Sequence, residues 1–169
     1  MRLHLVDRSE KLVREWRVAF AAFPEVTIEH GDILKVAHTA LVSPANSYGY
    51  MDGGIDLAYR NFFGRQIERK VQEKIQAVAG PYLPVGKAIV VDTGNAEIPY
   101  LVSAPTMFLP EPIEADSCRL AMTAALAVAF EYGKDWKALF CPGMGTGVGQ
   151  VPPREAAKAM AEAFAAAAT

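Results

Sequence analysis

Four glycines stand at alternate positions near the end of the chain, in Pro142-Gly-Met-Gly-Thr-Gly-Val-Gly149. An apolar, strand-like run over 137–141 precedes them, and an Ala-rich, helix-like segment begins at Val151. Glycine lacks a Cβ and adopts positive φ, so successive peptide N–H groups can turn toward one anion, and a following helix start adds further N–H groups. The pattern predicts a binding site for a phosphate or diphosphate, formed by Gly143, Met144, Gly145, Thr146, Gly147, Val148 and Gly149.

Two familiar glycine loops are excluded by register. The dinucleotide pattern G-x-G-x-x-G fails because Val148 or Gln150 occupies its last position, and no Gly-Lys-Ser/Thr follows to make a Walker loop. A surface loop that binds nothing remains the structural alternative.

Composition limits the class of protein. The 169 residues are 51% hydrophobic and 21% charged, which predicts a single globular domain over 1–169. Lys and Arg number 17 against 19 Asp and Glu, a net charge of −2 without any dense cationic cluster. Because general nucleic-acid affinity comes largely from neutralising phosphates, a general nucleic-acid binder is disfavoured.

The cysteines and histidines give no basis for a metal centre. Cys118 and Cys141 lack metal-ligand spacing, and His4, His30 and His38 are scattered along the chain. We therefore expect no metal site and no cofactor.

No segment has the character of a membrane anchor. The most weakly charged stretch, 115–130, still contains Asp116 and Arg119, and the N-terminus lacks a basic-then-apolar signal region. These features predict a cytoplasmic protein without membrane partners.

The hydrophobic periodicity predicts strands and helices that largely alternate. Strands are expected over 3–7, 26–29, 39–42, 87–92, 100–104 and 137–141, and helices over 9–23, 53–64, 65–79, 114–132 and 151–168. The short turn at 93–95 favours a hairpin between its two flanking strands. The order predicts a three-layer α/β/α sandwich on a mixed, mostly parallel sheet of about six strands.

Polar loops follow several of these strands. In a parallel sheet the carboxyl ends of the strands meet at one edge, where ligands bind. We therefore expect four loops to converge there: Gly31-Asp32, 43–56, Pro105-Thr106 and 143–149.

Four motifs in this order resemble the macrodomain family of ADP-ribose-binding modules, over about 26–155. They are Gly31-Asp32-Ile33, Val42-Ser-Pro-Ala-Asn46-Ser47, Gly53-Gly54-Ile55-Asp56 and the glycine-rich loop. The resemblance implies that ADP-ribose lies across the strand ends.

The resemblance implies that two of these motifs bind the adenosine and a ribose of the ligand. By position, Asp32 accepts a hydrogen bond from the adenine amino group beside the Ile33 backbone, and the Asn46 amide binds and orients ribose hydroxyls at the catalytic end. A turn-forming Asp32 and an Asx turn at Asn46 are the alternatives without a ligand.

The third motif is implied to approach the distal ribose and the α-phosphate through the backbone of Gly53, Gly54 and Ile55. Asp56 stands where hydrolytic members carry the acid that activates water, or it simply stabilises the helix N-terminus. Asp56 comes one residue after Ile55, which belongs to the apolar stripe of the predicted helix. Each helical residue turns by about 100°, so the Asp56 side chain points away from the stripe and need not be buried.

Three departures from the family pattern affect catalysis more than binding. Ser43-Pro44 replaces Asn-Ala, Met51-Asp52 shortens the glycine run, and Val148 stands where an aromatic is often found. Tyr48, Tyr50 or Phe108 are candidates for a substitute ring.

The resemblance implies binding of ADP-ribose or an ADP-ribosylated substrate, and hydrolysis at the distal ribose of a mono-ADP-ribosyl ester, ADP-ribose 1″-phosphate or O-acetyl-ADP-ribose. The enzyme would be an ADP-ribosyl hydrolase or an ADP-ribose 1″-phosphate phosphatase, with Asp56 and Asn46 at the reacting end. The alternatives are a non-catalytic ADP-ribose reader, or an α/β domain that binds another phosphorylated metabolite.

Overall fold

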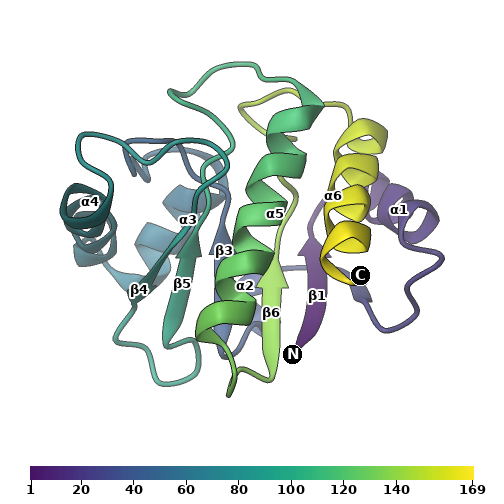
Figure 1. Ribbon diagram of the computed structural model, residues 1–169, viewed down its shortest axis with the longest axis horizontal. Coiled ribbons are helices and arrows are strands. Elements are labelled where there is room, and N and C mark those ends of the chain that lie inside the picture. The colour runs from purple at the N-terminus through teal and green to yellow at the C-terminus, as the bar shows by residue number, and fades with distance from the viewer.

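The computed structural model describes residues 1–169 and contains one six-stranded sheet of order β2-β1-β6-β3-β5-β4 (Figure 1). The strands are β1 Arg2–Asp7, β2 Thr27–His30, β3 Ala40–Ser43, β4 Ile89–Asp92, β5 Tyr100–Ser103 and β6 Ala138–Cys141. All neighbouring strands are parallel except β4 and β5, which pair antiparallel. The mixed, mostly parallel sheet and the predicted hairpin are confirmed.

Six helices form the two outer layers. They are α1 Glu10–Ala19, α2 Ile33–Val36, α3 Gly54–Phe63, α4 Gln66–Val78, α5 Ala115–Tyr132 and α6 Pro153–Ala167. Buried side chains of α1, α5 and α6 pack on one face of the sheet, and those of α2, α3 and α4 pack on the other. In Figure 1 the ribbons of α5 and α6 lie in front of the sheet. The three-layer α/β/α sandwich is therefore confirmed.

The strands bury both faces because their side chains alternate. Val42 of β3 faces the α1, α5 and α6 layer, while the adjacent Leu41 faces the α3 and α4 layer. Leu139 and Phe140 of β6 divide in the same way. Strands that are covered on both faces have consecutive apolar residues rather than alternating apolar and polar ones. Strands β3 and β6 have such continuous apolar runs in the sequence.

Helix α1 begins as expected but ends early. The Ser9 hydroxyl caps its start by accepting a hydrogen bond from the Leu12 N–H at 3.2 Å. The helix ends at Ala19 rather than at Pro24, because Phe20 and Phe23 leave the helical path and pack against Phe164 of α6, with ring centroids 5.9 and 5.1 Å away.

The segment after β2 contains a helical turn that periodicity does not reveal. Asp32 caps this turn, α2, by accepting a hydrogen bond from the Leu34 N–H at 3.0 Å. Four residues are too few for a helical period to appear in the sequence.

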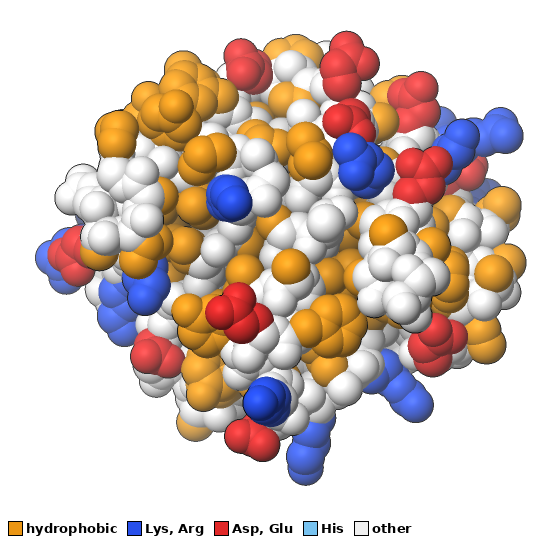
Figure 2. All heavy atoms as spheres, viewed as in Figure 1, with side chains coloured by type: hydrophobic (Ala, Val, Ile, Leu, Met, Phe, Trp, Pro, Cys, Tyr) orange, Lys and Arg blue, Asp and Glu red, His pale blue; other side chains and the backbone are white.

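Two features of the molecule concern its possible partners: the distribution of charge on one face and the apolar character of the helices. On the face covered by α5 and α6, Lys and Arg side chains are scattered among acidic and apolar ones and form no single patch (Figure 2). None of the helices has both the length and the apolar character needed to cross a bilayer.

Candidate functional site

Loops at the carboxyl edge of the sheet line two adjoining cavities. The β2-side cavity, about 430 Å³, is bordered by the loops after β1, β2 and β6, and the β5-side cavity, about 130 Å³, by the loops after β3, β5 and β6. Gly54, Ile55, Gly143 and Gly147 line both. The four loops expected at this edge therefore lie along one continuous cleft.

The glycine-rich loop offers main-chain donors to this cleft. No hydrogen bond within the chain uses the N–H groups of residues 144–149, whereas the Gly143 N–H donates to the Asp7 Oδ2 at 2.9 Å. Gly145 has a φ of +73°, which turns the loop back on itself. A run of unpaired amides beside a cavity is suited to an anion.

The start of α3 supplies a second set of donors. Gly53 at its N-cap has no side chain to cap the helix, and the N–H groups of residues 54–56 have no partner within the chain. Gly53 and Gly54 line the β5-side cavity opposite the glycine-rich loop. Amides from two segments, nearly ninety residues apart in the sequence, thus border one space.

Asp56 lies in the wall of the β5-side cavity, where its side chain is only 7% exposed. The expectation that it need not be buried is wrong, because α3 lies directly on the sheet: the Tyr59 hydroxyl donates to the Val42 carbonyl at 3.0 Å. The Ser43 hydroxyl donates to the Asp56 Oδ1 at 2.5 Å. Burial raises the pKa of Asp56 to about 7, and the hydrogen bond from Ser43 opposes this shift.

The bond between Ser43 and Asp56 can be tested against a matched neighbour. Ser103 pairs with Ser43 in the β3–β5 register and is equally buried, but its hydroxyl has no hydrogen-bond partner. We expect Ser43→Ala to raise the pKa of Asp56 further, because the ionised carboxylate loses its donor. Above neutral pH it should also cost about 1–3 kcal/mol of unfolding free energy.

The control, Ser103→Ala, should leave that pKa unchanged and leave stability equal or slightly higher. The measurement is the carboxyl ¹³C titration of Asp56 together with denaturant unfolding. Equal effects of the two variants on the Asp56 titration would contradict the role assigned to Ser43.

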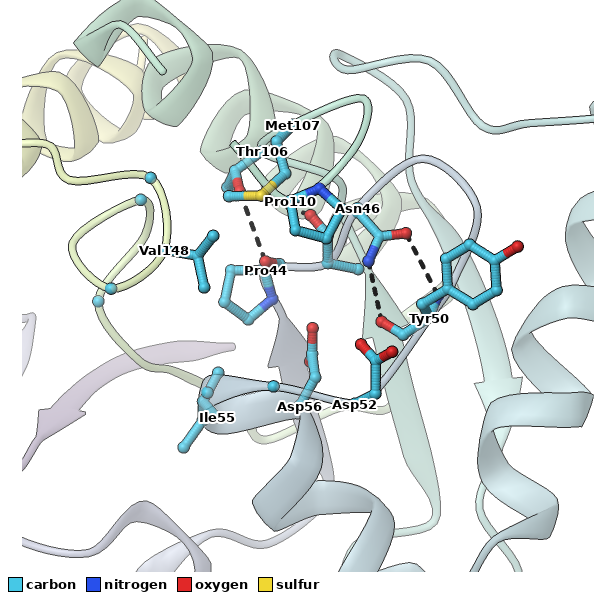
Figure 3. Close-up of a pocket in the computed structure, with 17 residues that line it drawn as sticks. Pro44, Asn46, Tyr50, Asp52, Ile55, Asp56, Thr106, Met107, Pro110 and Val148 are labelled. Carbon is cyan, nitrogen blue, oxygen red and sulfur yellow. Dashed lines mark hydrogen bonds between the residues drawn. The ribbon is translucent and has the colours of Figure 1, made fainter. Parts of the chain in front are cut away.

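Asn46 lines the β5-side cavity, but its amide also shapes the loop (Figure 3). Its Oδ1 accepts hydrogen bonds from the Tyr48 and Tyr50 N–H groups at 3.1 and 3.2 Å, and its Nδ2 donates to the Tyr50 carbonyl at 2.9 Å. The Asx turn is therefore formed. One Nδ2 hydrogen remains for a ribose hydroxyl.

Asp32 lines the β2-side cavity together with Ile33, and it also bonds within the protein. Its Oδ2 accepts a hydrogen bond from the Arg8 guanidinium at 2.8 Å, and its Oδ1 accepts the Leu34 N–H. The bond from Arg8 is the main reason why the pKa of Asp32 is below its ordinary value. Asp32 is therefore an ionised acceptor at the end of the cleft away from Asp56.

Sequence reasoning missed three polar residues of the cleft. Asp7 is the last residue of β1 and Arg8 follows it, and polar residues at the end of an apolar strand are a signal of the same kind as the other loops. Asp52, which interrupts the glycine run in the sequence, lines the β5-side cavity beside Asp56 (Figure 3). Val148, at the position of the missing aromatic, lines the same cavity.

The model of the Macro domain family matches residues 42–160, which include the end of β3 and all of α3, β6 and the glycine-rich loop. The chain belongs to the macrodomain family. The sequence resemblance is confirmed.

Relatives and solved structures agree with this membership. An uncharacterised protein of Aquifex aeolicus is 37% identical to this macrodomain over 139 residues, which is 82% of this chain and 79% of the relative. A macro domain-containing protein of Listeria monocytogenes is 28% identical over 134 residues, covering 79% and 75%.

Among solved structures, the macrodomain of Mycobacterium tuberculosis DarG has a TM-score of 0.68 at 23% identity, covering 80% of this macrodomain and 87% of that chain. An Oceanobacillus iheyensis macrodomain mutant with ADPR also scores 0.68, at 22% identity, covering 79% and 73%. Thermosipho africanus DarTG in complex with ADP-ribose scores 0.68 at 16% identity, covering 80% of this chain and 37% of that one. At these identities the likeness establishes the fold.

Proposed function

We propose that this macrodomain binds ADP-ribose along the cleft and hydrolyses a bond at its distal ribose. The single observation that carries the binding proposal is the pair of unpaired amide sets, residues 144–149 and 54–56, on one cleft. A pyrophosphate is the anion that matches donors from both sides. Solved macrodomains with ADPR or ADP-ribose support this choice of ligand.

The side chains that line each cavity indicate which end of the ligand would lie there. The adenosine would occupy the larger β2-side cavity, where Asp32 accepts the adenine amino group beside the Ile33 backbone. The distal ribose would occupy the β5-side cavity, where the free Nδ2 hydrogen of Asn46 meets a hydroxyl and Asp56 faces the anomeric carbon.

Asp56 is suited to activate water, because a carboxylate whose pKa is about 7 is both partly ionised and basic enough to take a proton at neutral pH. In the proposed step, the water oxygen bonds to the anomeric carbon while its proton passes to Asp56. The bond from that carbon to the leaving oxygen breaks, and the leaving oxygen takes a proton from solvent. The preformed amides hold the pyrophosphate so that the ribose is correctly placed.

A non-catalytic reader is the second candidate. It is favoured by the engagement of the Asn46 amide in its own loop and by Val148 in place of a ring. Both features loosen the placement of the distal ribose, on which hydrolysis depends steeply.

Calorimetry and turnover together distinguish these functions. ADP-ribose should bind more tightly than ATP, NAD or a sugar phosphate, and equal affinity for one of these would contradict the binding proposal. Wild-type protein should turn over at least one of a mono-ADP-ribosyl ester, ADP-ribose 1″-phosphate and O-acetyl-ADP-ribose, and Asp56→Ala should not. ADP-ribose binding without turnover of any substrate would establish the reader.

A further inference from the structure

The loop between β3 and α3 forms much of the wall of the β5-side cavity. Asn46, Tyr50 and Asp52 of this loop line the cavity (Figure 3). Met51, between Tyr50 and Asp52, does not line it: this residue is only 1% exposed and packs in the core that α3 and α4 cover. The position of the Met51 backbone therefore decides where its two cavity-lining neighbours lie.

A carboxylate of α4 holds that backbone. The Met51 N–H donates to the Glu68 Oε2 at 2.6 Å, and the Glu68 Oε1 lies 3.6 Å from the Arg60 Nη1 of α3. The Glu68 side chain is 24% exposed and lines neither cavity of the cleft. Hydrogen bonds to a charged acceptor are stronger than those to a neutral one, so this carboxylate fixes the Met51 N–H firmly.

This bond is the last one made by a main-chain N–H before α3. The N–H groups of residues 52–56 have no partner within the chain, and the next bonded N–H is that of Leu57, which donates to the Gly53 carbonyl at 3.2 Å. Gly53 and Gly54 have no side chains to pack, and a Cβ at either would meet no atom within 4 Å. Residues 52 and 53 are therefore held from one side by Glu68 and from the other by the helix.

The earlier part of the loop has its own supports. The Ser47 N–H donates to the Met107 carbonyl at 2.8 Å, and the Ser47 carbonyl accepts the Leu83 N–H at 2.8 Å. These bonds do not involve Glu68, and neither do those of the Asn46 amide. Loss of the Glu68 carboxylate would therefore release residues 51–53 and leave Asn46 in place.

Building on the proposed function, we infer that Glu68 is a positioning residue for the distal ribose. It does not touch the ligand; through the Met51 N–H it places Tyr50, Asp52 and Gly53 against the sugar. Hydrolysis depends steeply on such placement, because a displacement of about 1 Å can cost on the order of 100-fold in rate. The adenosine and the pyrophosphate would meet parts of the cleft that Glu68 does not hold, so its effect is confined to the sugar end.

ADP is the probe that separates the two ends, because it has the adenosine and both phosphates but no distal ribose. Glu68→Ala should weaken binding of ADP-ribose by about tenfold and that of ADP by less than about twofold, since one hydrogen bond to a charged group is lost at the sugar end alone. With any substrate that wild-type protein hydrolyses, kcat should fall by about tenfold or more and KM should change less.

A second measurement needs no ligand. Amide hydrogen exchange of Met51 should be slow in wild-type protein and at least about tenfold faster in Glu68→Ala, because the N–H loses its only acceptor. The amide resonances of residues 52–54 should shift with it, while those of residues 144–149 should stay in place. Alanine favours helix, so α4 should remain folded in this variant.

Three further variants locate the effect. Glu68→Gln keeps an oxygen acceptor without the charge and should lie between wild type and Glu68→Ala in every measurement. Arg60→Gln removes the ion pair but leaves the Met51 bond, so the ratio of ADP-ribose affinity to ADP affinity should stay within about twofold of wild type. Glu73→Ala makes the same truncation at an exposed site of α4 and should leave that ratio unchanged.

Equal weakening of ADP and ADP-ribose in Glu68→Ala would overturn this inference, and so would unchanged Met51 exchange or an unchanged affinity ratio. Wild-type protein that binds ADP-ribose no more tightly than ADP would also overturn it, because the distal ribose would then make no contact for Glu68 to position. Absence of binding of both ligands to wild-type protein would instead contradict the proposed function.

Discussion

Gly147→Glu is expected to lower the affinity for ADP-ribose by about 100-fold or more while the protein keeps its fold. Residue 147 is not at positive φ, and a Cβ built there meets no atom within 4 Å. The new side chain places a carboxylate among the amides that we assign to the pyrophosphate. Hydrogen bonds to charged groups contribute about 1.5–3 kcal/mol each, so loss of one or two gives an effect of this size. Calorimetry with ADP-ribose measures it.

The choice of glycine matters for this experiment. Gly145 has a φ of +73°, and a Cβ there would lie 2.6 Å from the Cys118 Sγ, so its substitution would disturb the fold as well as the ligand. Gly147→Ala is the matched control and should bind ADP-ribose within about threefold of wild type. Wild-type affinity in a folded Gly147→Glu protein would mean that the glycine-rich loop does not hold the pyrophosphate.

Asp56→Asn is expected to abolish turnover and, at alkaline pH, to stabilise the protein. The carboxyl ionises near pH 3.8 in the unfolded chain and at about 7 in the fold. Below both values it is neutral in both states and has no effect. As the pH rises between them, the unfolded chain ionises first, so wild-type protein loses stability, by up to about 4 kcal/mol above pH 7. Asparagine does not ionise and avoids this loss.

Thermal or denaturant unfolding at several pH values measures the effect. The stability of Asp56→Asn relative to wild type should grow from pH 4 to 7 and then remain constant. ADP-ribose binding should persist in this variant, because the amides that we assign to the pyrophosphate are untouched. A stability difference that is independent of pH would show that Asp56 is not held in a destabilising environment.

The fold was predictable because periodicity and order determine it. Apolar runs alternate with helical stripes, and this order alone gives a mostly parallel sheet with helices on both faces. The end of α1 was not predictable, because Phe20 and Phe23 suit a helical stripe as well as they suit packing on Phe164. That choice depends on contacts more than 140 residues away.

The site was predictable in its loops but not in its internal bonds. The glycine spacing and the strand ends identify the segments that line the cleft. The contact from the Gly143 N–H to Asp7 requires β1 and β6 to be neighbours, which local sequence does not specify. The burial of Asp56 depends likewise on how α3 lies over the end of β3, where Ser43 meets it.

The site that we assign to the pyrophosphate consists of main-chain amides. The cationic side chain that lines the cleft, Arg8, is already paired with Asp32. Peptide dipoles carry no counterions that binding would release. The dissociation constant for ADP-ribose should therefore change by less than about threefold between low and high ionic strength, unlike that of a lysine-lined phosphate site. A protein that binds its ligand through main-chain amides would therefore keep its affinity in a cell whose interior is rich in salt.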